Sequence, residues 1–235
     1  MAVMTSHAFV LHYFRYKDNS VMAKMLTKEQ GLITFIIKGV NSKKSKKKAL
    51  ISSLNLLEVS YRSREDSELQ LAREISVVKP YNNLNSDVVK NALVLFIREV
   101  LYKVIREDRQ DKEVFELYQN QLDNLESSQH YGNFHLEFML RLSHCLGFAP
   151  QNNYSEQASS FSLTDGKFMP YNKNDDRLMS PNLSKLLADL LAEKEVVIHS
   201  NDKYLLIDNL LDYFRNQLDY MQEVNSHKIF REVFA

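Results

Sequence analysis

The 235-residue chain is poor in the residues that define several classes of protein. It has one cysteine, Cys145, so no intramolecular disulfide can form and a metal site built from thiolates is excluded. No apolar run approaches the length of a membrane span, and the amino-terminal segment MAVMTSHAF lacks a basic stretch followed by an apolar one. We therefore expect a soluble protein of a reducing cytoplasm, with no membrane partner.

Glycine and proline are also scarce, with 5 and 4 residues, and the 44% hydrophobic content is enough for one large or two small domains. The formal net charge is zero but unevenly distributed. Residues 1–80 contain 14 Lys and Arg against 7 Asp and Glu, whereas the rest of the chain contains 16 against 23. A basic front part is typical of a nucleic-acid-binding surface, and the acidic remainder is not.

Runs rich in β-branched and aromatic residues predict five short strands in the first eighty residues. They are expected at 6–14, 20–26, 32–40, 51–62 and 67–78, with turns at 17–19 and 63–66. A closed five-stranded antiparallel arrangement of this size favours an OB-fold β-barrel. An SH3-like barrel is the alternative that the residues alone leave open.

The hydrophobic period changes to that of helices after Pro80. Asn85 or Ser86 is the expected cap of the first helix, with Asp87 in its first turn, and Gly147 is placed to end the third. Helices are expected from 85 onward and at 114–125, 134–146, 181–193 and 206–221.

These patterns predict an α+β protein. An OB-fold domain at 1–80 precedes a mainly helical domain at 81–235, with the boundary at 79–84. The helical domain contains an irregular insertion at about 151–180, in which Asp165 and Gly166 favour the turn of a small hairpin.

A cluster of five lysines follows the third predicted strand: Lys43, Lys44, Lys46, Lys47 and Lys48. Five like charges this close repel one another, so the cluster is either a solvated loop or a surface for an anion. No Gly-Lys-Ser/Thr sequence follows Gly39, which excludes a phosphate-binding nucleotide loop. The candidate DNA-binding residues are Lys43, Lys44, Lys46, Lys47, Lys48, Lys38, Arg15, Lys17, Lys24 and Arg64. Phe14, Tyr16 and Tyr61 are candidates for base stacking, with core packing as their alternative role.

Candidate catalytic residues are missing. His130, His135 and His144 are not spaced to share a helical face as metal ligands, and we expect them at the surface or at helix ends. Cys145 lies on an apolar helical stripe, where an inert packed thiol is expected. We predict no catalytic residue, no metal and no cofactor, and hence no enzyme. An enzyme of unrecognised type would require a concave cluster of titratable groups that sequence order does not reveal.

Several segments resemble the RecO family of recombination mediators. The segment AFVLHYFRYKDNSVMAKMLTKEQGLITFIIKGVNSKKSK is similar to the amino-terminal signature of that family. LRLSHCLGFAP resembles its Leu-Gly-Tyr/Phe-x-Pro helix end, and LLDYFRNQLDYMQEVNSHKIFREV resembles its closing helices. The matching residues are Val10, Leu11, Asp18, Thr27, Glu29, Gly31, Lys38, Gly39, Lys43, Ser45, Leu146, Gly147, Phe148 and Pro150. The resemblance covers essentially the whole chain.

The resemblance implies a bacterial, nucleoid-associated DNA repair and recombination protein that binds single- and double-stranded DNA and anneals complementary strands. With RecR, it would help to load RecA onto DNA coated by single-stranded-DNA-binding protein. The acidic C-terminal tail of that coating protein is the expected partner of the helical domain, in a groove near 133–141. The alternative is a non-enzymatic scaffold for proteins, in which the lysines form a solvated loop.

One departure from the family concerns zinc. Many members carry a four-cysteine zinc site just after the Leu-Gly-x-x-Pro segment, whereas 152–170 contains no cysteine here. We therefore expect the hairpin to be held by packing, or else to be mobile.

Overall fold

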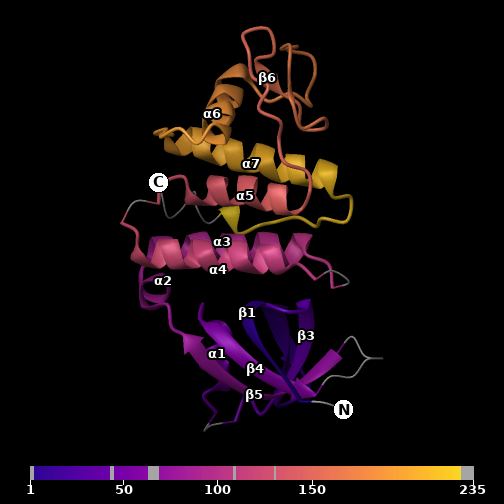
Figure 1. Ribbon diagram of the computed structural model, residues 1–235, viewed down its shortest axis with the longest axis vertical. Helices are drawn as coiled ribbons and strands as arrows, with labels where there is room; N and C mark the ends of the chain where they lie inside the picture. Colours follow the sequence, from indigo (N-terminus) through magenta and orange to yellow (C-terminus); the bar gives the residue numbers. More distant parts are fainter. Residues whose placement is uncertain (1–2, 43–44, 63–68, 108–109, 130, 229–235) are drawn as a thin grey trace. The chain divides into compact units, whose positions relative to one another are not determined.

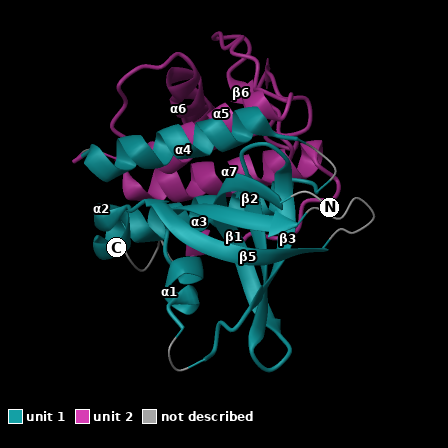
Figure 2. Ribbon diagram, turned by 60° about the horizontal axis from the view of Figure 1, so that its bottom comes forward, with its two compact units in different colours: residues 1–128 teal, residues 129–235 magenta. Residues whose placement is uncertain are grey.

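The computed structural model describes residues 3–42, 45–62, 69–107, 110–129 and 131–228. The chain forms two compact units, Met1–Ser128 and Gln129–Ala235 (Figure 2). The expected domain boundary at 79–84 lies inside the first unit, where the barrel passes into helices.

The first unit is built on a closed barrel (Figure 1). Its strands are hydrogen-bonded in the order β1-β2-β3-β5-β4. Its strands are β1 (Val3–Tyr16), β2 (Ser20–Thr27), β3 (Gly31–Lys38), β4 (Leu56–Arg62) and β5 (Leu69–Lys79). Neighbouring strands are antiparallel except β3 and β5, which pair in parallel. A short helix, α1 (Lys47–Ser52), connects β3 to β4. This is an OB-type barrel, so the predicted fold class is confirmed.

Side chains from alternate positions along the strands fill the barrel. Val10, Ala23, Phe35 and Val59 are among its fully or almost fully buried core residues. A bulge between Val10 and His12 places one extra residue in β1. The side chains after the bulge therefore alternate between core and outer face in the opposite sense to those before it. Beyond the bulge, Tyr13 packs against the core, while its neighbours His12 and Phe14 are exposed on the outer face.

The segment before β4 differs from the prediction. A strand was expected from residue 51, but 47–52 is helix α1 and β4 begins at Leu56. The reason is that Ile51, on α1, is fully buried in the barrel core. A short apolar run does not distinguish a helix that buries one side chain from a strand that buries alternate ones. The turn expected at 63–66 lies outside the described residues.

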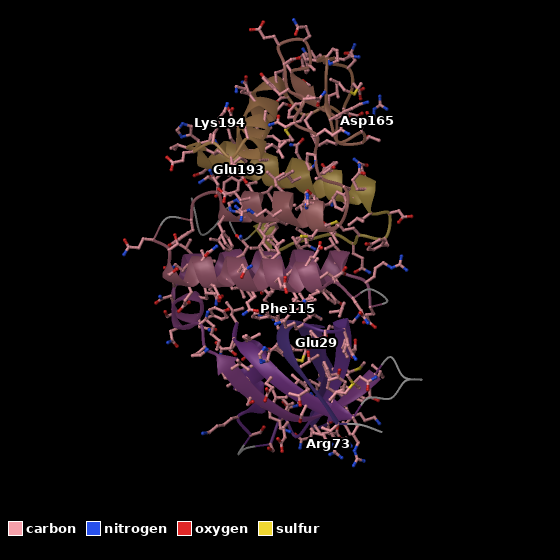
Figure 3. All side chains as sticks on the ribbon, viewed as in Figure 1. Glu29, Arg73, Phe115, Asp165, Glu193 and Lys194 are labelled. Atoms are coloured by element: carbon pink, nitrogen blue, oxygen red, sulfur yellow. The ribbon has the colours of Figure 1, made fainter. Side chains whose placement is uncertain are left out.

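Three more helices follow the barrel in the described part of the first unit: α2 (Asn82–Ser86), α3 (Val88–Val104) and α4 (Lys112–Ser127). The cap of α3 is Asp87, whose side chain accepts hydrogen bonds from the backbone N–H groups of Val89 (2.8 Å) and Lys90 (3.0 Å). The prediction of Asn85 or Ser86 as the cap was therefore wrong, because these residues belong to the separate turn α2. Phe115 of α4 points toward the barrel (Figure 3), where its ring lies 5.4 Å from that of Phe9.

The described part of the second unit contains three helices and a small hairpin. Its elements are α5 (Phe134–Cys145), β6 (Ser160–Phe161), β7 (Phe168–Met169), α6 (Pro181–Leu191) and α7 (Ser200–Gln217). Gly147 follows the end of α5 with φ +87°, a conformation that favours glycine. The helix end predicted there is confirmed.

The hairpin predicted at Asp165 and Gly166 is present, and it is held by aromatic packing. Gly166 has φ +67°, as a turn of this kind requires. The ring of Phe161 lies 5.3 Å from that of Phe168 and 5.3 Å from that of Tyr213 on α7. The two rings of the hairpin thus pack on each other and on α7, in a segment, 151–180, that carries no cysteine.

Two expectations about side chains of α5 can be compared with the structure. His135 lies at a helix end, one of the two positions expected for it, and is buried there, with 5% of its surface exposed. Burial and the nearby positive charge of Lys203 lower the pKa of His135 to about 3, so its ring is neutral. Cys145 is half-buried, less enclosed than the packed thiol that the apolar stripe predicted. His144 is exposed, and His130 lies outside the described residues.

Candidate nucleic-acid interface

The turn between β1 and β2 lies against the segment that follows β3. The backbone carbonyl of Asn19 accepts hydrogen bonds from the N–H groups of Gly39 (2.7 Å) and Val40 (3.2 Å). The side-chain oxygen of Asn19 also accepts one from the Asn41 N–H at 3.0 Å. Two basic segments that are separate in the sequence therefore meet at one end of the barrel.

Strand pairing and one lysine contact complete this arrangement. Tyr16 pairs with Ser20, and Ser20 pairs with Lys38, so the ends of the first three strands lie side by side. The Lys47 ammonium donates a hydrogen bond to the Lys38 carbonyl at 3.0 Å, which places the start of α1 beside the end of β3. We call this region the basic end; its residues are Arg15, Lys17, Lys38, Lys46, Lys47 and Lys48. Of the remaining candidates, Lys43, Lys44 and Arg64 lie outside the described residues.

The described part of the lysine cluster begins a helix rather than continuing a loop. Lys46 is the N-cap of α1, and Lys47 and Lys48 form its first turn, which contains no acidic residue. Lys46 and Lys48 are exposed and Lys47 is half-buried. Positive charges at this end oppose the helix dipole, so the arrangement does not serve the stability of α1.

An aromatic and aliphatic row crosses the outer face of the barrel next to the basic end. Phe14 pairs with Met22, Met22 with Ile36, and Ile36 with Leu71, so four strands each contribute one side chain. Phe14 is 42% exposed, which is unusual for a phenylalanine with a core role. We call these four residues the apolar row.

The three stacking candidates have different surroundings. Phe14 belongs to the apolar row, and Tyr16 is half-buried with the Lys17 ammonium 5.3 Å from its ring centre. Tyr61 is a core residue with 1% exposure, and its hydroxyl donates to the Gln30 side chain at 2.8 Å. Tyr61 is therefore removed from the candidates, and Phe14 is the most accessible of the three.

Lys24, another of the candidate DNA-binding residues, lies apart from the basic end. Its ammonium lies 2.8 Å from the Glu107 carboxylate and 5.5 Å from the ring centre of Tyr102. Glu107 also accepts a hydrogen bond from the buried Thr34 hydroxyl at 3.0 Å. Sequence reasoning missed this pair because the two residues are far apart in the chain and meet only when α3 packs on the barrel.

The described residues offer little to a metal ion. No group of three or more His, Cys, Asp or Glu side chains among them is arranged to hold one. The hairpin that corresponds to the zinc region of the family is filled by aromatic rings and has no thiol ligands, so it does not fit that metal. Within the part of the chain that the structure describes, no helix is both long and apolar enough to cross a bilayer.

Residues 133–141, expected near a partner-binding groove, form most of α5. Phe134, Phe138 and Met139 are buried in the second unit, whereas Glu137 and Arg141 are exposed. The apolar side chains of this segment thus contribute mainly to the core.

A five-stranded barrel of this order, with a basic end beside an exposed apolar row, defines an OB-fold protein with a helical extension. Residues 1–81 match the family model described as "Recombination protein O N terminal", and residues 85–219 match "Recombination protein O C terminal". The chain therefore belongs to the RecO family of DNA repair proteins.

Curated relatives agree with this assignment, two of them over nearly the full length. The chain is 28% identical over 233 residues to "DNA repair protein RecO" of Flavobacterium psychrophilum, covering 97% of this chain and 98% of the relative. It is 28% identical over 234 residues to the protein of the same name from Christiangramia forsetii, with 97% and 98% covered. The corresponding Bacteroides fragilis protein is 30% identical over 161 residues, with 68% and 66% covered.

Proposed function

We propose that this protein binds single- and double-stranded DNA through the basic end and the apolar row, and anneals complementary strands. In this proposal it also assists RecA loading, together with RecR, on DNA coated by single-stranded-DNA-binding protein. The observation that carries the proposal is the meeting of the β1–β2 turn, the end of β3 and the start of α1 at one end of an OB barrel. The strand 2–3 face and the adjoining loops are where OB folds hold oligonucleotides.

The chemistry of the surface supports two kinds of contact. Lysine and arginine neutralise phosphates and release counterions, which gives affinity that does not depend on sequence and falls with salt. The exposed Phe14 ring offers a stacking surface to an unpaired base. Annealing follows from the same contacts, because a surface that screens the charge of two strands lets them pair without bond chemistry. We accordingly propose no enzymatic turnover and a nucleoid-associated, cytoplasmic location.

The protein partners belong to the second unit in this proposal. Its residues, 129–235, contain 10 Lys and Arg against 14 Asp and Glu, a balance that disfavours DNA. We propose that this unit receives the tail of single-stranded-DNA-binding protein near α5. Titration calorimetry with a peptide of that tail tests this part, and the absence of heat at micromolar protein would contradict it.

The test of DNA binding is a titration of a labelled oligonucleotide across salt concentrations, followed by fluorescence anisotropy. We compare the wild type with a triple variant, Lys46→Ala, Lys47→Ala and Lys48→Ala. For single-stranded DNA we expect the slope of log K against log salt to fall by about 2, since each lost phosphate contact contributes roughly 0.7. A matched control replaces three exposed lysines of the second unit, Lys173, Lys185 and Lys228, by alanine.

The control should behave as the wild type. Coincident curves for the wild type and the Lys46–Lys48 variant would instead favour the alternative, a scaffold for proteins in which the lysines are only solvated. Nucleotide or DNA hydrolysis by the purified protein would contradict the proposal that it is not an enzyme.

A further inference from the structure

A second group of basic side chains surrounds Tyr102 on the last turn of α3. The His12 ring is stacked on the Tyr102 ring, with centroids 4.6 Å apart and planes inclined by 19°. The ammonium groups of Lys24 and Lys103 lie 5.5 Å and 5.4 Å from the centre of the same ring. This group, which we call the Tyr102 cluster, lies where α3 packs on β1 and is distinct from the basic end.

Arg98 belongs to this cluster and is its least expected member. It precedes Tyr102 by one helical turn, so both side chains share the face of α3 that meets β1. Arg98 is only 7% exposed, and its Nε has no hydrogen-bond partner among the described residues. Burial lowers the pKa of Arg98, and the residues that act against this are two phenols, Tyr118 and Tyr13, rather than carboxylates.

A guanidinium remains protonated in proteins, so Arg98 keeps a buried positive charge, and no carboxylate of the described residues is among the groups that act on its pKa. Such an arrangement costs stability unless an anion completes it. The charge of Arg98 also acts on His12. The pKa of His12 is lowered by partial burial, then by Arg98, Lys103 and Lys24, against the opposing effect of Glu99. An imidazole has at least one N–H donor in either protonation state, so His12 is available to donate a hydrogen bond to an anion at the same place.

We propose that Arg98, His12 and Lys24 form a phosphate-binding subsite for the backbone of a DNA strand that runs across the outer face of the barrel. This inference rests on the proposed function and adds a site to it. The strand passes from the basic end over the apolar row to the Tyr102 cluster.

The register of the sheet supports a continuous path. Tyr16, Phe14 and His12 follow one another on the outer face of β1, and the His12 and Phe14 rings are 6.2 Å apart. The four-residue step along β1 from His12 to Tyr16 spans about 13 Å, which is the rise of roughly four stacked nucleotides. One barrel thus offers cations at both ends of a short single strand and an aromatic surface between them.

Glu107 limits this subsite in the free protein. Its carboxylate is bound to Lys24 and to the Thr34 hydroxyl, as a phosphate oxygen would be. Incoming DNA must displace or tolerate this negative charge. Glu107→Gln should therefore tighten the binding of single-stranded DNA several-fold, the opposite of the effect expected from loss of a merely structural ion pair.

The main test uses Arg98→Met in the full-length protein, with Lys185→Met in the second unit as a control for loss of one charge. We expect Arg98→Met to raise the melting temperature, because it removes a buried unpaired charge, and to weaken single-stranded DNA binding about tenfold. The slope of log K against log salt should fall by roughly 0.7, the contribution of one phosphate contact on a single strand. Lys185→Met should match the wild type, because Lys194 also pairs with Asp189, the partner of Lys185.

Arg98→Met with a lower melting temperature and unchanged DNA affinity would show a structural role and overturn the proposal. If Arg98→Met does not fold, Arg98→Lys provides the second variant: it keeps the charge but not the planar fork, so weaker DNA binding at a near-native melting temperature supports the subsite. Unchanged affinity in Arg98→Lys together with no gain in Glu107→Gln would refute it.

Two further comparisons separate the sources of failure. If the Lys46–Lys48 variant loses DNA binding while Arg98→Met does not, the proposed function stands and the subsite falls. If the wild type does not bind DNA at all, the proposed function itself falls. Inorganic phosphate should raise the melting temperature of the wild type less than an oligonucleotide with the same phosphate concentration; equal stabilisation would indicate a site for free anions and contradict a DNA subsite.

Discussion

Phe14 gives the most direct test of stacking at the scale of a single residue. Phe14→Ala should weaken single-stranded DNA binding by about 1–3 kcal/mol, the range typical of a base stacked on an aromatic ring. Binding of duplex DNA should change less, because its bases already stack on one another. Anisotropy titrations with both oligonucleotides measure the difference.

The matched control for Phe14 is Tyr171→Ala, which removes a similarly exposed aromatic ring from the second unit. It should leave both affinities unchanged. Equal losses for single-stranded and duplex DNA in Phe14→Ala would indicate a general disturbance of the barrel face and contradict stacking.

His135 makes the second unit sensitive to acid. Its pKa is lowered from 6.5 to about 3 in the folded protein, by burial and then by Lys203. Below about pH 6.5 the unfolded chain takes up a proton at His135, whereas the folded chain does not. The stability that the neutral, buried His135 allows is therefore complete above that pH, and the free energy of unfolding falls as the pH falls toward 3. The loss amounts to about 1.4 kcal/mol per pH unit within the window.

We expect His135→Leu to lose less stability than the wild type between pH 7.5 and pH 5, measured as the urea midpoint of the second unit. The difference should approach roughly 2 kcal/mol at pH 5. His144→Gln is the control, because His144 is exposed at the other end of the same helix. Parallel acid sensitivity in the wild type and His135→Leu would contradict this account.

At the scale of elements, the hairpin of β6 and β7 stands on aromatic packing rather than on a metal. Phe161→Ala removes a fully buried ring that touches Phe168 and Tyr213, and should destabilise the second unit by about 3–5 kcal/mol. A chelator such as EDTA should leave the melting curve of the wild type unchanged. A fall in melting temperature on chelation would show that metal contributes to the fold.

Helices and strands could be predicted from the sequence where neighbouring residues determine them. The strands of the barrel and the helix around Phe138 were predicted because period and turn residues act within a few positions. The helix α1 was missed, since its reason is that Ile51 fills the barrel from a segment that is only six residues long. Asp87 was placed in the first turn of α3 instead of at its cap, an error of one residue that pattern alone does not prevent.

The candidate site was predicted in part for the same reason. Lys38 and Lys46 could be chosen from local charge, and the structure places them at one end of the barrel. The Lys24–Glu107 pair and the buried Arg98 depend on α3 packing against β1, which no local pattern records. An arginine inside the apolar stripe of α3 was the one available signal for the Tyr102 cluster.

At the scale of the whole molecule, charge divides between the two units. Residues 1–128 contain 20 Lys and Arg against 16 Asp and Glu, whereas residues 129–235 have the opposite balance. Hydrogen exchange of the full chain with and without DNA should show slower exchange in peptides covering 12–24 and 34–52. Peptides from α6 and the hairpin should exchange equally fast in both states, and protection confined to the second unit would contradict the proposed interface.

The order of strands in the barrel also governs how the chain folds. β1 pairs with β2, its neighbour in sequence, and with β4, about fifty residues later. On the ribosome the β1–β2–β3 meander can therefore form early, but closure waits until β4 and β5 have been synthesised. Contacts between distant segments slow folding, and until closure β1 and β3 each present an unpaired edge. The interval before β5 emerges is thus the period in which the nascent chain is most exposed to aggregation.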